Sequence, residues 1–243
     1  GANNILSRLF PAGFYYKTFK WPPSLWLFYE HFIRKAAGLG ESPKAKNPDR
    51  YEQIFHYCDV MIIGGGISGL SAALAAARAK CDVLLVDENP YFGGYLSNSE
   101  ASVNGKKIDD WIRIVLEELK SYEHVKLLNR TSAMGYYDYN YVTALEKVTN
   151  HHQELSKTLP RERYWRIRAK KIILAQGAFE RPLVFADNDR PGIMMASAGM
   201  KYLCRYGVLP GKSAVLFTNN DHAYLSAFEF VDKGAKVTII DSR

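Results

Sequence analysis

A glycine-rich turn between an apolar run and an alanine-rich run constrains this chain more than any other feature. Residues 58–69 read CDVMIIGGGISG, so Gly64, Gly66 and Gly69 follow a predicted strand and open a predicted helix at 70–80. Glycines at this spacing permit a tight turn, close approach of backbone N–H groups to a pyrophosphate, and close packing of the helix on the strand. The stretch therefore predicts the strand, turn and helix of a dinucleotide-binding unit.

The carboxylate expected of such a unit is also present. A second apolar strand is predicted at 83–86, and it ends in Asp87 and Glu88. Asp87 lies twenty-three residues after Gly64, where dinucleotide-binding folds place the carboxylate that accepts hydrogen bonds from ribose hydroxyls. The sequence leaves open whether Asp87 or Glu88 makes this contact, and whether the dinucleotide is NAD or FAD. The alternative is a βαβ unit whose glycine turn binds nothing.

Further small residues are expected beside the dinucleotide. A glycine pair soon after the ribose carboxylate lets a loop lie close to the cofactor. The apolar run at 171–174 predicts a strand that returns beside the first one and ends in a turn of small residues. The predicted cofactor-binding residues are Gly64, Gly66, Ile67, Ser68, Gly69, Asp87, Glu88, Gly93, Gly94, Ala175, Gln176 and Gly177.

The wider pattern predicts an α/β fold with a Rossmann-like parallel sheet of the two-dinucleotide-binding flavoprotein type. Apolar residues at helical spacing predict a helix at 108–122, and a strand is expected at 125–128. Another helix is expected at 195–206. Three segments rich in Tyr, Val and Thr predict an inserted antiparallel β-meander, at 133–138, 141–148 and 163–168.

The last thirty residues repeat the spacing of the glycine unit. A strand, a helix and a strand are expected over 213–240, and Asp241 lies twenty-three residues after Thr218. Thr218 and Asn220 replace the first two glycines, and a side chain at position 220 would obstruct a pyrophosphate. We therefore interpret residues 212–243 as the start of a truncated second dinucleotide-type unit that is structural or has a different ligand.

The first fifty residues are set apart by crowded aromatic side chains around Pro22-Pro23. We interpret 1–50 as an aromatic N-terminal arm and linker, with a helix at about 24–37. Its aromatic side chains need to bury against the following domain or another subunit. The first dinucleotide-binding domain is assigned to 51–211. Because the chain does not begin with Met, we expect it to be a piece of a longer protein.

Charge and hydropathy exclude several classes of function. The 243 residues carry a net charge of +7, but Lys and Arg are scattered, which favours a solvated surface, including one that meets an acidic partner, over nucleic-acid binding. No apolar stretch approaches the roughly 20 residues that a membrane span needs. We therefore expect no nucleic acid and no membrane among the partners.

The reactive side chains form no recognisable centre. Cys58, Cys81 and Cys204 are widely separated, which excludes a CxxC redox or zinc motif and fits a reducing, cytoplasmic location. His151 and His152 are adjacent in a predicted turn, without nearby ligands for a metal. We expect no metal site and no catalytic residue in this chain.

Several motifs together resemble the α subunit of heterotetrameric sarcosine oxidases over almost the whole chain. They are FPAGFYYKTF at 10–19, AAGLG at 36–40, DRY at 49–51, the glycine motif, VDE at 86–88, GAFERPLVF at 177–185, NDRPG at 188–192 and FTNND at 217–221. Related α subunits of dye-linked proline dehydrogenases and of hydrogen cyanide synthase share the nucleotide-binding part and are rivals. One departure is Gln176, where such folds commonly carry Thr.

The resemblance implies a fold like that of pyridine nucleotide-disulfide oxidoreductases, with NAD held in the first unit. It implies that a separate β subunit with FAD oxidises the amine, that FMN lies at the α/β interface, and that smaller subunits complete a heterotetramer. The family oxidises sarcosine to glycine, with hydrogen peroxide and a one-carbon unit for tetrahydrofolate as products. The alternatives are an FAD enzyme that takes NAD(P)H in its second unit, and a scaffold with a vestigial nucleotide site.

Overall fold

The computed structural model describes residues 22–38, 40, 43–98, 101–152, 156 and 158–243. The FPAGFYYKTF motif lies outside the described residues. The chain divides into two units, residues 1–48 and 49–243. In the first unit, α3 (Trp26–Ala36) follows a 3₁₀ turn, which confirms the helix expected there. The boundary between 51–211 and 212–243 stays a prediction.

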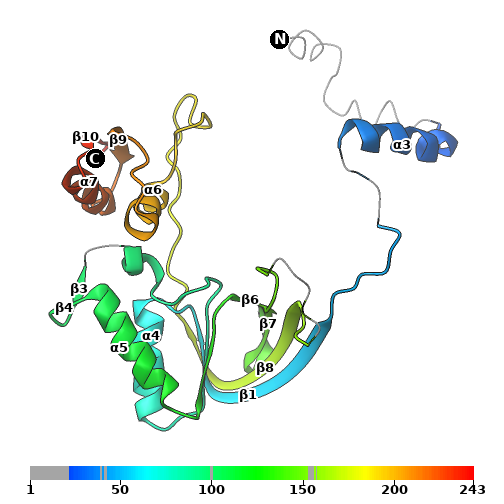
Figure 1. Ribbon diagram of the computed structural model, residues 1–243, viewed down its shortest axis with the longest axis horizontal. Coiled ribbons are helices and arrows are strands. Elements are labelled where there is room, and N and C mark those ends of the chain that lie inside the picture. The colour runs from blue at the N-terminus through cyan, green and yellow to red at the C-terminus, as the bar shows by residue number, and fades with distance from the viewer. Residues whose placement is uncertain (1–21, 39, 41–42, 99–100, 153–155, 157) are drawn as a thin grey trace. The chain divides into compact units, whose positions relative to one another are not determined.

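One six-stranded sheet organises the described part of the second unit (Figure 1). Its strands are β1 (Tyr51–Ile63), β2 (Val83–Val86), β5 (Val125–Leu128), β6 (Thr131–Tyr137), β7 (Tyr141–Lys147) and β8 (Glu162–Leu174). They are ordered β5-β2-β1-β8-β7-β6. β5, β2, β1 and β8 pair in parallel, whereas β7 pairs antiparallel with β8 and β6. The parallel sheet with an inserted antiparallel meander is confirmed.

Two strands are longer than the sequence predicts. β1 begins at Tyr51, well before the apolar run, and β8 joins the predicted meander segment to the returning strand without a break. The prediction of two separate segments is wrong because β8 continues through Lys170 as one strand. The ladder to β1 omits only the Asp59 and Lys170 positions, where the Lys170 ammonium group pairs with the Asp59 carboxylate at 2.7 Å. The parallel pairing has the same register on both sides of this ion pair.

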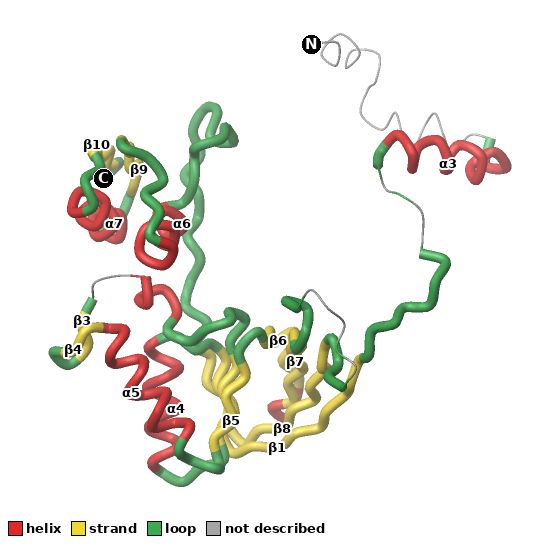
Figure 2. Tube along the Cα trace, viewed as in Figure 1, coloured by secondary structure: helices red, strands yellow, loops and turns green. Residues whose placement is uncertain are grey.

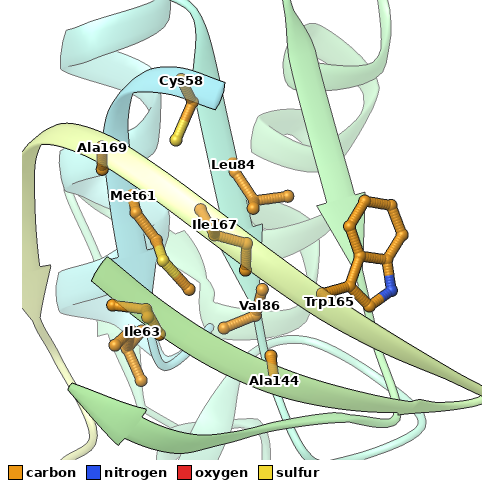
Figure 3. Packing of buried hydrophobic residues seen from close by; sticks show 10 residues of the cluster. Cys58, Met61, Ile63, Leu84, Val86, Ala144, Trp165, Ile167 and Ala169 are labelled. Carbon is orange, nitrogen blue, oxygen red and sulfur yellow. The ribbon is translucent and has the colours of Figure 1, made fainter. Parts of the chain in front are cut away.

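The sheet buries a different apolar cluster on each side. One cluster joins the parallel strands to the meander, and Figure 3 shows Met61, Leu84 and Ile167 meeting within it. Burial there raises the pKa of the Cys58 thiol to about 12, so Cys58 packs as an apolar side chain. The other cluster lies under α4 (Ile67–Arg78) and α5 (Ile108–Lys120), which pack side by side on the sheet (Figure 2).

The C-terminal segment forms a strand–helix–strand unit, as its repeated spacing predicts. β9 (Ser213–Thr218) and β10 (Lys236–Asp241) pair in parallel, and α7 (His222–Asp232) connects them. α6 (Ala196–Met200) continues into a π-helical turn and packs with α7 around Phe230. Short elements complete the described residues: a 3₁₀ turn at Gly94–Asn98, β3 (Ser102–Val103), β4 (Lys106–Lys107) and a 3₁₀ turn at Asp138–Asn140.

No helix among the described residues has the length and apolar character to cross a membrane.

Candidate functional site

The glycine turn joins the end of β1 to the start of α4. Gly64 has a φ of +103°, which favours glycine, and its N–H donates to the Val86 carbonyl at 2.9 Å. Gly69 lies on the first turn of α4, directly against the Gly64 carbonyl group. A Cβ at Gly69 would overlap that carbonyl oxygen. Gly69 therefore permits the close packing of helix on turn that brings the helix start to the strand end.

Gly66 differs from Gly69 because its open side faces no protein backbone at close range. A Cβ built on Gly66 meets only the Gly94 Cα, at 3.8 Å, which is an ordinary van der Waals contact. Gly66 is the N-cap of α4, and no side chain caps this helix start. Backbone N–H groups in the first helical turn thus stay available to a ligand, and the helix dipole favours an anion there. A pyrophosphate fits this cradle.

The Asp87 carboxylate is fixed beside the turn by three hydrogen bonds. Its Oδ2 accepts from the Gly65 N–H at 2.6 Å, and its Oδ1 accepts from the backbone N–H and side-chain Nδ2 of Asn89 at 2.8 and 3.0 Å. The Asp87 residue is 8% exposed, whereas the neighbouring Glu88 is exposed to solvent. A carboxylate oxygen has two acceptor sites, so Oδ2 retains capacity for a further donor.

The loop after β2 and the end of β8 form the remaining walls. The Gly93 N–H donates to the Gly65 carbonyl at 2.8 Å, which lays the loop against the glycine turn. The Ala175 N–H donates to the Ile63 carbonyl at 2.8 Å, so that the chain beyond β8 leaves the sheet next to the same turn. Both contacts bring segments distant in sequence to the carboxyl ends of the parallel strands, where α/β folds bind ligands.

All the predicted site residues except Gly69 line one cleft of about 1470 Å³. Gly69 lies behind the turn, as its packing role requires. The structure therefore brings the predicted residues together, and their contact with a dinucleotide stays a prediction. Further lining residues that the sequence analysis missed come from the loop after β2, the meander and the C-terminal segment: Tyr91, Tyr95, Thr131, Met134, Tyr136, Lys201 and His222. Met134 and Tyr136 lie within β6, and Lys201 and His222 lie in the C-terminal segment, so no local signal in the sequence indicates that they approach the cleft.

In the second dinucleotide-type unit, the unit's own side chains form hydrogen bonds at the positions that correspond to the glycine turn and to Asp87. The Asn220 Oδ1 accepts from the His222 N–H, the first N–H of α7, at 3.0 Å. The Asp241 carboxylate, which is the counterpart of Asp87, accepts from the Tyr224 hydroxyl at 3.0 Å and from the Arg243 guanidinium at 2.7 Å. Arg243 lowers the pKa of Asp241. The groups that would meet a pyrophosphate and a ribose in this unit are therefore engaged internally.

The histidine pair forms no metal centre with its described neighbours. His151 lies in a turn, and its ring is 4.3 Å from that of His152. Across the described stretches of the chain, no cluster of three His, Cys, Asp or Glu side chains has an arrangement that could hold a metal ion.

Comparisons with known proteins agree with this geometry. Residues 59–157, which contain the glycine turn and Asp87, match the family model of FAD dependent oxidoreductases. The chain is 49% identical over 99% of its length to sarcosine oxidase subunit alpha of Rhizobium meliloti. It is 40% identical over 85% of its length to the same subunit of Corynebacterium sp. strain U-96. The resemblance to sarcosine oxidase α subunits is confirmed.

This sarcosine oxidase-like chain spans about a quarter of the length of those relatives, namely 25% and 22%. Among solved structures, L-proline dehydrogenase from P. horikoshii superposes with a TM-score of 0.63 at 22% identity. That match covers 83% of this chain and 38% of the other. Thioredoxin reductase from Lactococcus lactis superposes with a TM-score of 0.52 at 21% identity, over 76% and 56% of the two chains. These structures share the Rossmann-like flavoprotein fold.

The packing at Gly69 yields a stability prediction. Gly69→Ala places a methyl group against the Gly64 carbonyl, and we expect it to lower the free energy of unfolding by about 2 kcal/mol through overpacking. Gly211→Ala is the matched control, because a Cβ there would lie 3.4 Å from the Ser213 carbonyl oxygen, an ordinary van der Waals contact. Urea denaturation followed by circular dichroism measures both variants. Equal stability of Gly69→Ala and the parent chain would contradict the packing role.

Proposed function

We propose that this chain is the dinucleotide-binding part of the α subunit of a sarcosine oxidase-like complex, and that its cleft holds an adenine dinucleotide. The observation that carries the proposal is the open, uncapped start of α4 at Gly66, where the protein leaves room for a phosphate. The 49% identity to sarcosine oxidase subunit alpha of Rhizobium meliloti, which extends over 99% of this chain, supports the assignment to this kind of complex.

The chain's own residues would hold the dinucleotide by its shared part. The N–H groups at the start of α4 would donate to the pyrophosphate, with Ile67 and Ser68 beside it. Asp87 would accept from a ribose hydroxyl through the remaining capacity of Oδ2. We favour Asp87 over Glu88 because its carboxylate is already fixed by three hydrogen bonds, so binding costs little further ordering.

NAD is the first candidate cofactor, because the resemblance to sarcosine oxidase α subunits implies it. FAD is the second candidate, and the match of residues 59–157 to FAD dependent oxidoreductases favours it. The cradle would contact only the pyrophosphate and a ribose, which NAD and FAD share, so it accommodates either dinucleotide. FAD and FMN of the wider complex would lie on or beside other subunits.

The amine chemistry would take place outside this chain. In the proposed complex, a β subunit oxidises sarcosine to glycine, oxygen is reduced to hydrogen peroxide, and a one-carbon unit passes to tetrahydrofolate. The β subunit and the smaller subunits would be the protein partners. The second dinucleotide-type unit would be structural, because Asn220, Tyr224 and Arg243 occupy its polar positions. A dye-linked amino-acid dehydrogenase is the alternative, and the fold of L-proline dehydrogenase supports it.

Gly66→Ala separates binding from folding. The added methyl group has room in the protein but lies where a phosphate would approach, so we expect dinucleotide affinity to fall about tenfold or more, and the thermal unfolding midpoint to stay unchanged. Isothermal titration of the chain with NAD and with FAD measures affinity. Gly211→Ala is again the control. Unchanged affinity for both dinucleotides in Gly66→Ala would contradict the assigned cradle.

The two adjacent carboxylates form a matched pair of variants. Asp87→Asn should weaken dinucleotide binding about tenfold, because it replaces a charged acceptor at the ribose position with an amide. Glu88→Gln removes the same charge one residue away, from an exposed side chain, and should leave affinity within about twofold. Titration calorimetry compares the two. The reverse order of effects would assign the ribose to Glu88.

The identity of the cofactor follows from the ligand that the protein carries. We expect NAD, identified by absorbance and mass spectrometry, to be released from the purified chain and from the α subunit of the purified full-length complex. Release of FAD from the chain would instead assign it to a flavin-carrying dehydrogenase or reductase. A well-folded chain that binds neither added dinucleotide would indicate a vestigial site.

A further inference from the structure

The outward side of the meander carries an unusual set of side chains. Ile167 points into the core shown in Figure 3, and Ile54 packs against the same cluster, so alternation along each strand sends their neighbours to the opposite side. We call this outward side the aromatic–arginine face. Its members are Phe55, Tyr57, Tyr137, Tyr141, Tyr164, Arg166 and Arg168.

Large aromatic surfaces stay exposed on the aromatic–arginine face. Phe55 is 74% exposed, and Tyr57 and Tyr137 are each 55% exposed. Phe55 and Tyr57 project from β1 and Tyr137 from the edge strand β6, and the half-buried rings of Tyr164 and Tyr141 lie on β8 and β7 between them. Exposed apolar groups that are contiguous, rather than scattered, mark a surface that another molecule covers.

Both arginines of the face are stacked on its rings. The Arg166 guanidinium lies 5.3 Å from the ring centre of Phe55 and 5.8 Å from that of Tyr164. The Arg168 guanidinium lies 5.1 Å from the ring centre of Tyr141. Stacking orders these long side chains before any partner arrives, so that less conformational entropy is lost on binding.

The arginines on the two sides of β8 have different neighbours. On the inward side, Arg163 has Glu52 and Glu146 as its register neighbours, and it pairs with them at 3.0 and 3.6 Å. On the outward side, the register neighbours of Arg166 are Phe55 and Thr143.

No carboxylate among the described residues forms an ion pair with either outward arginine. The neighbours of Arg168 are Tyr57 and Tyr141, and Arg168 donates only to the carbonyls of Asp138 and Tyr139. The aromatic–arginine face therefore presents positive charge that the described residues of this sheet do not neutralise. On the inward side of the same strands, by contrast, Glu52 and Glu146 neutralise the charge of Arg163.

We propose that the aromatic–arginine face is a docking surface for an acidic protein surface. Partner carboxylates would pair with Arg166 and Arg168, and partner apolar side chains would cover Phe55 and Tyr57. Tyr and Arg are the residue types enriched at the energetic centres of protein–protein interfaces. The proposal does not depend on dinucleotide binding, because none of these side chains lines the cleft.

Charge argues against the other occupants. A second copy that docked through the same face would set arginine against arginine, because the nearest carboxylates on this side of β1 and β8 are already engaged, Asp59 with Lys170 and Glu162 with Asn150. A nucleic acid would need a longer track of cations along its phosphates than Arg166 and Arg168 supply. An acidic protein surface satisfies both the charge and the aromatic rings.

The test uses the full 243-residue chain and a defined probe. The probe is a fluorescein-labelled peptide in which glutamate alternates with leucine and phenylalanine, with a glutamine version as its neutral counterpart. We expect fluorescence anisotropy to show binding of the glutamate peptide. We expect Arg166→Gln to weaken it about tenfold, since a charge-assisted pair is lost, and Arg166→Lys to weaken it less. Phe55→Ser should also weaken it.

Arg113→Gln is the matched control, because Arg113 is an exposed arginine of α5 that pairs with Asp110 and Glu117. It should leave peptide binding unchanged, and thermal unfolding verifies that every variant is folded. Four results would each overturn the proposal: no binding of the glutamate peptide at millimolar concentration, equal binding of its glutamine counterpart, tighter binding of a labelled oligouridine, or a dimer in sedimentation velocity that Phe55→Ser dissolves.

Discussion

The hydrogen bond from the Gly65 N–H to the Asp87 carboxylate joins the two strand ends between which the cleft opens. Asp87 is also tied through its backbone, because its N–H donates to Leu128 and its carbonyl accepts from the Thr131 N–H, each at about 2.8–2.9 Å. One residue therefore connects the glycine turn, the end of β2, the end of β5 and the start of β6. A charge-assisted bond in a nearly buried position is worth about 1.5–3 kcal/mol, so Asp87 stabilises the turn as well as offering an acceptor to a ligand.

The parts of the fold and site that could be predicted from the sequence are those with a local signal. The strands at 83–86 and 125–128 were predicted with the bounds that the structure shows, because short apolar runs between turns are a local signal. The first half of β1 was missed because its alternating polar and aromatic residues gain their strand pairing from β8, more than a hundred residues away. The contribution of Met134 and Tyr136 to the cleft is hidden because β6 pairs locally with β7, and only the position of the whole meander beside β8 brings β6 to the cleft.

The two repeated units have the same residue spacing but differ in the groups that they leave free for a ligand. Both have the same twenty-three residues between the first turn position and the carboxylate, and both fold as strand, helix and strand. In the first unit, Gly66 leaves the helix start uncapped and open. In the second unit, the Asn220 side chain accepts from the first N–H of the helix, and Tyr224 and Arg243 engage Asp241. Local spacing specifies the backbone path, while a few side chains decide whether backbone donors are left for a ligand.

The long strands β1 and β8 connect two chemically distinct regions. Their second halves belong to the parallel sheet, and their carboxyl ends place the Gly64 turn and Ala175 at the cleft. Their first halves pair with each other and, through β7, extend the sheet into the meander. One side of this extension contributes to the cleft, because Thr131, Met134 and Tyr136 of β6 line it. Its outward side orders Arg166 on the rings of Phe55 and Tyr164. The strands that support the glycine turn therefore also build the aromatic–arginine face, none of whose side chains lines the cleft. This separation fits the proposal that the dinucleotide and a protein partner bind at different places.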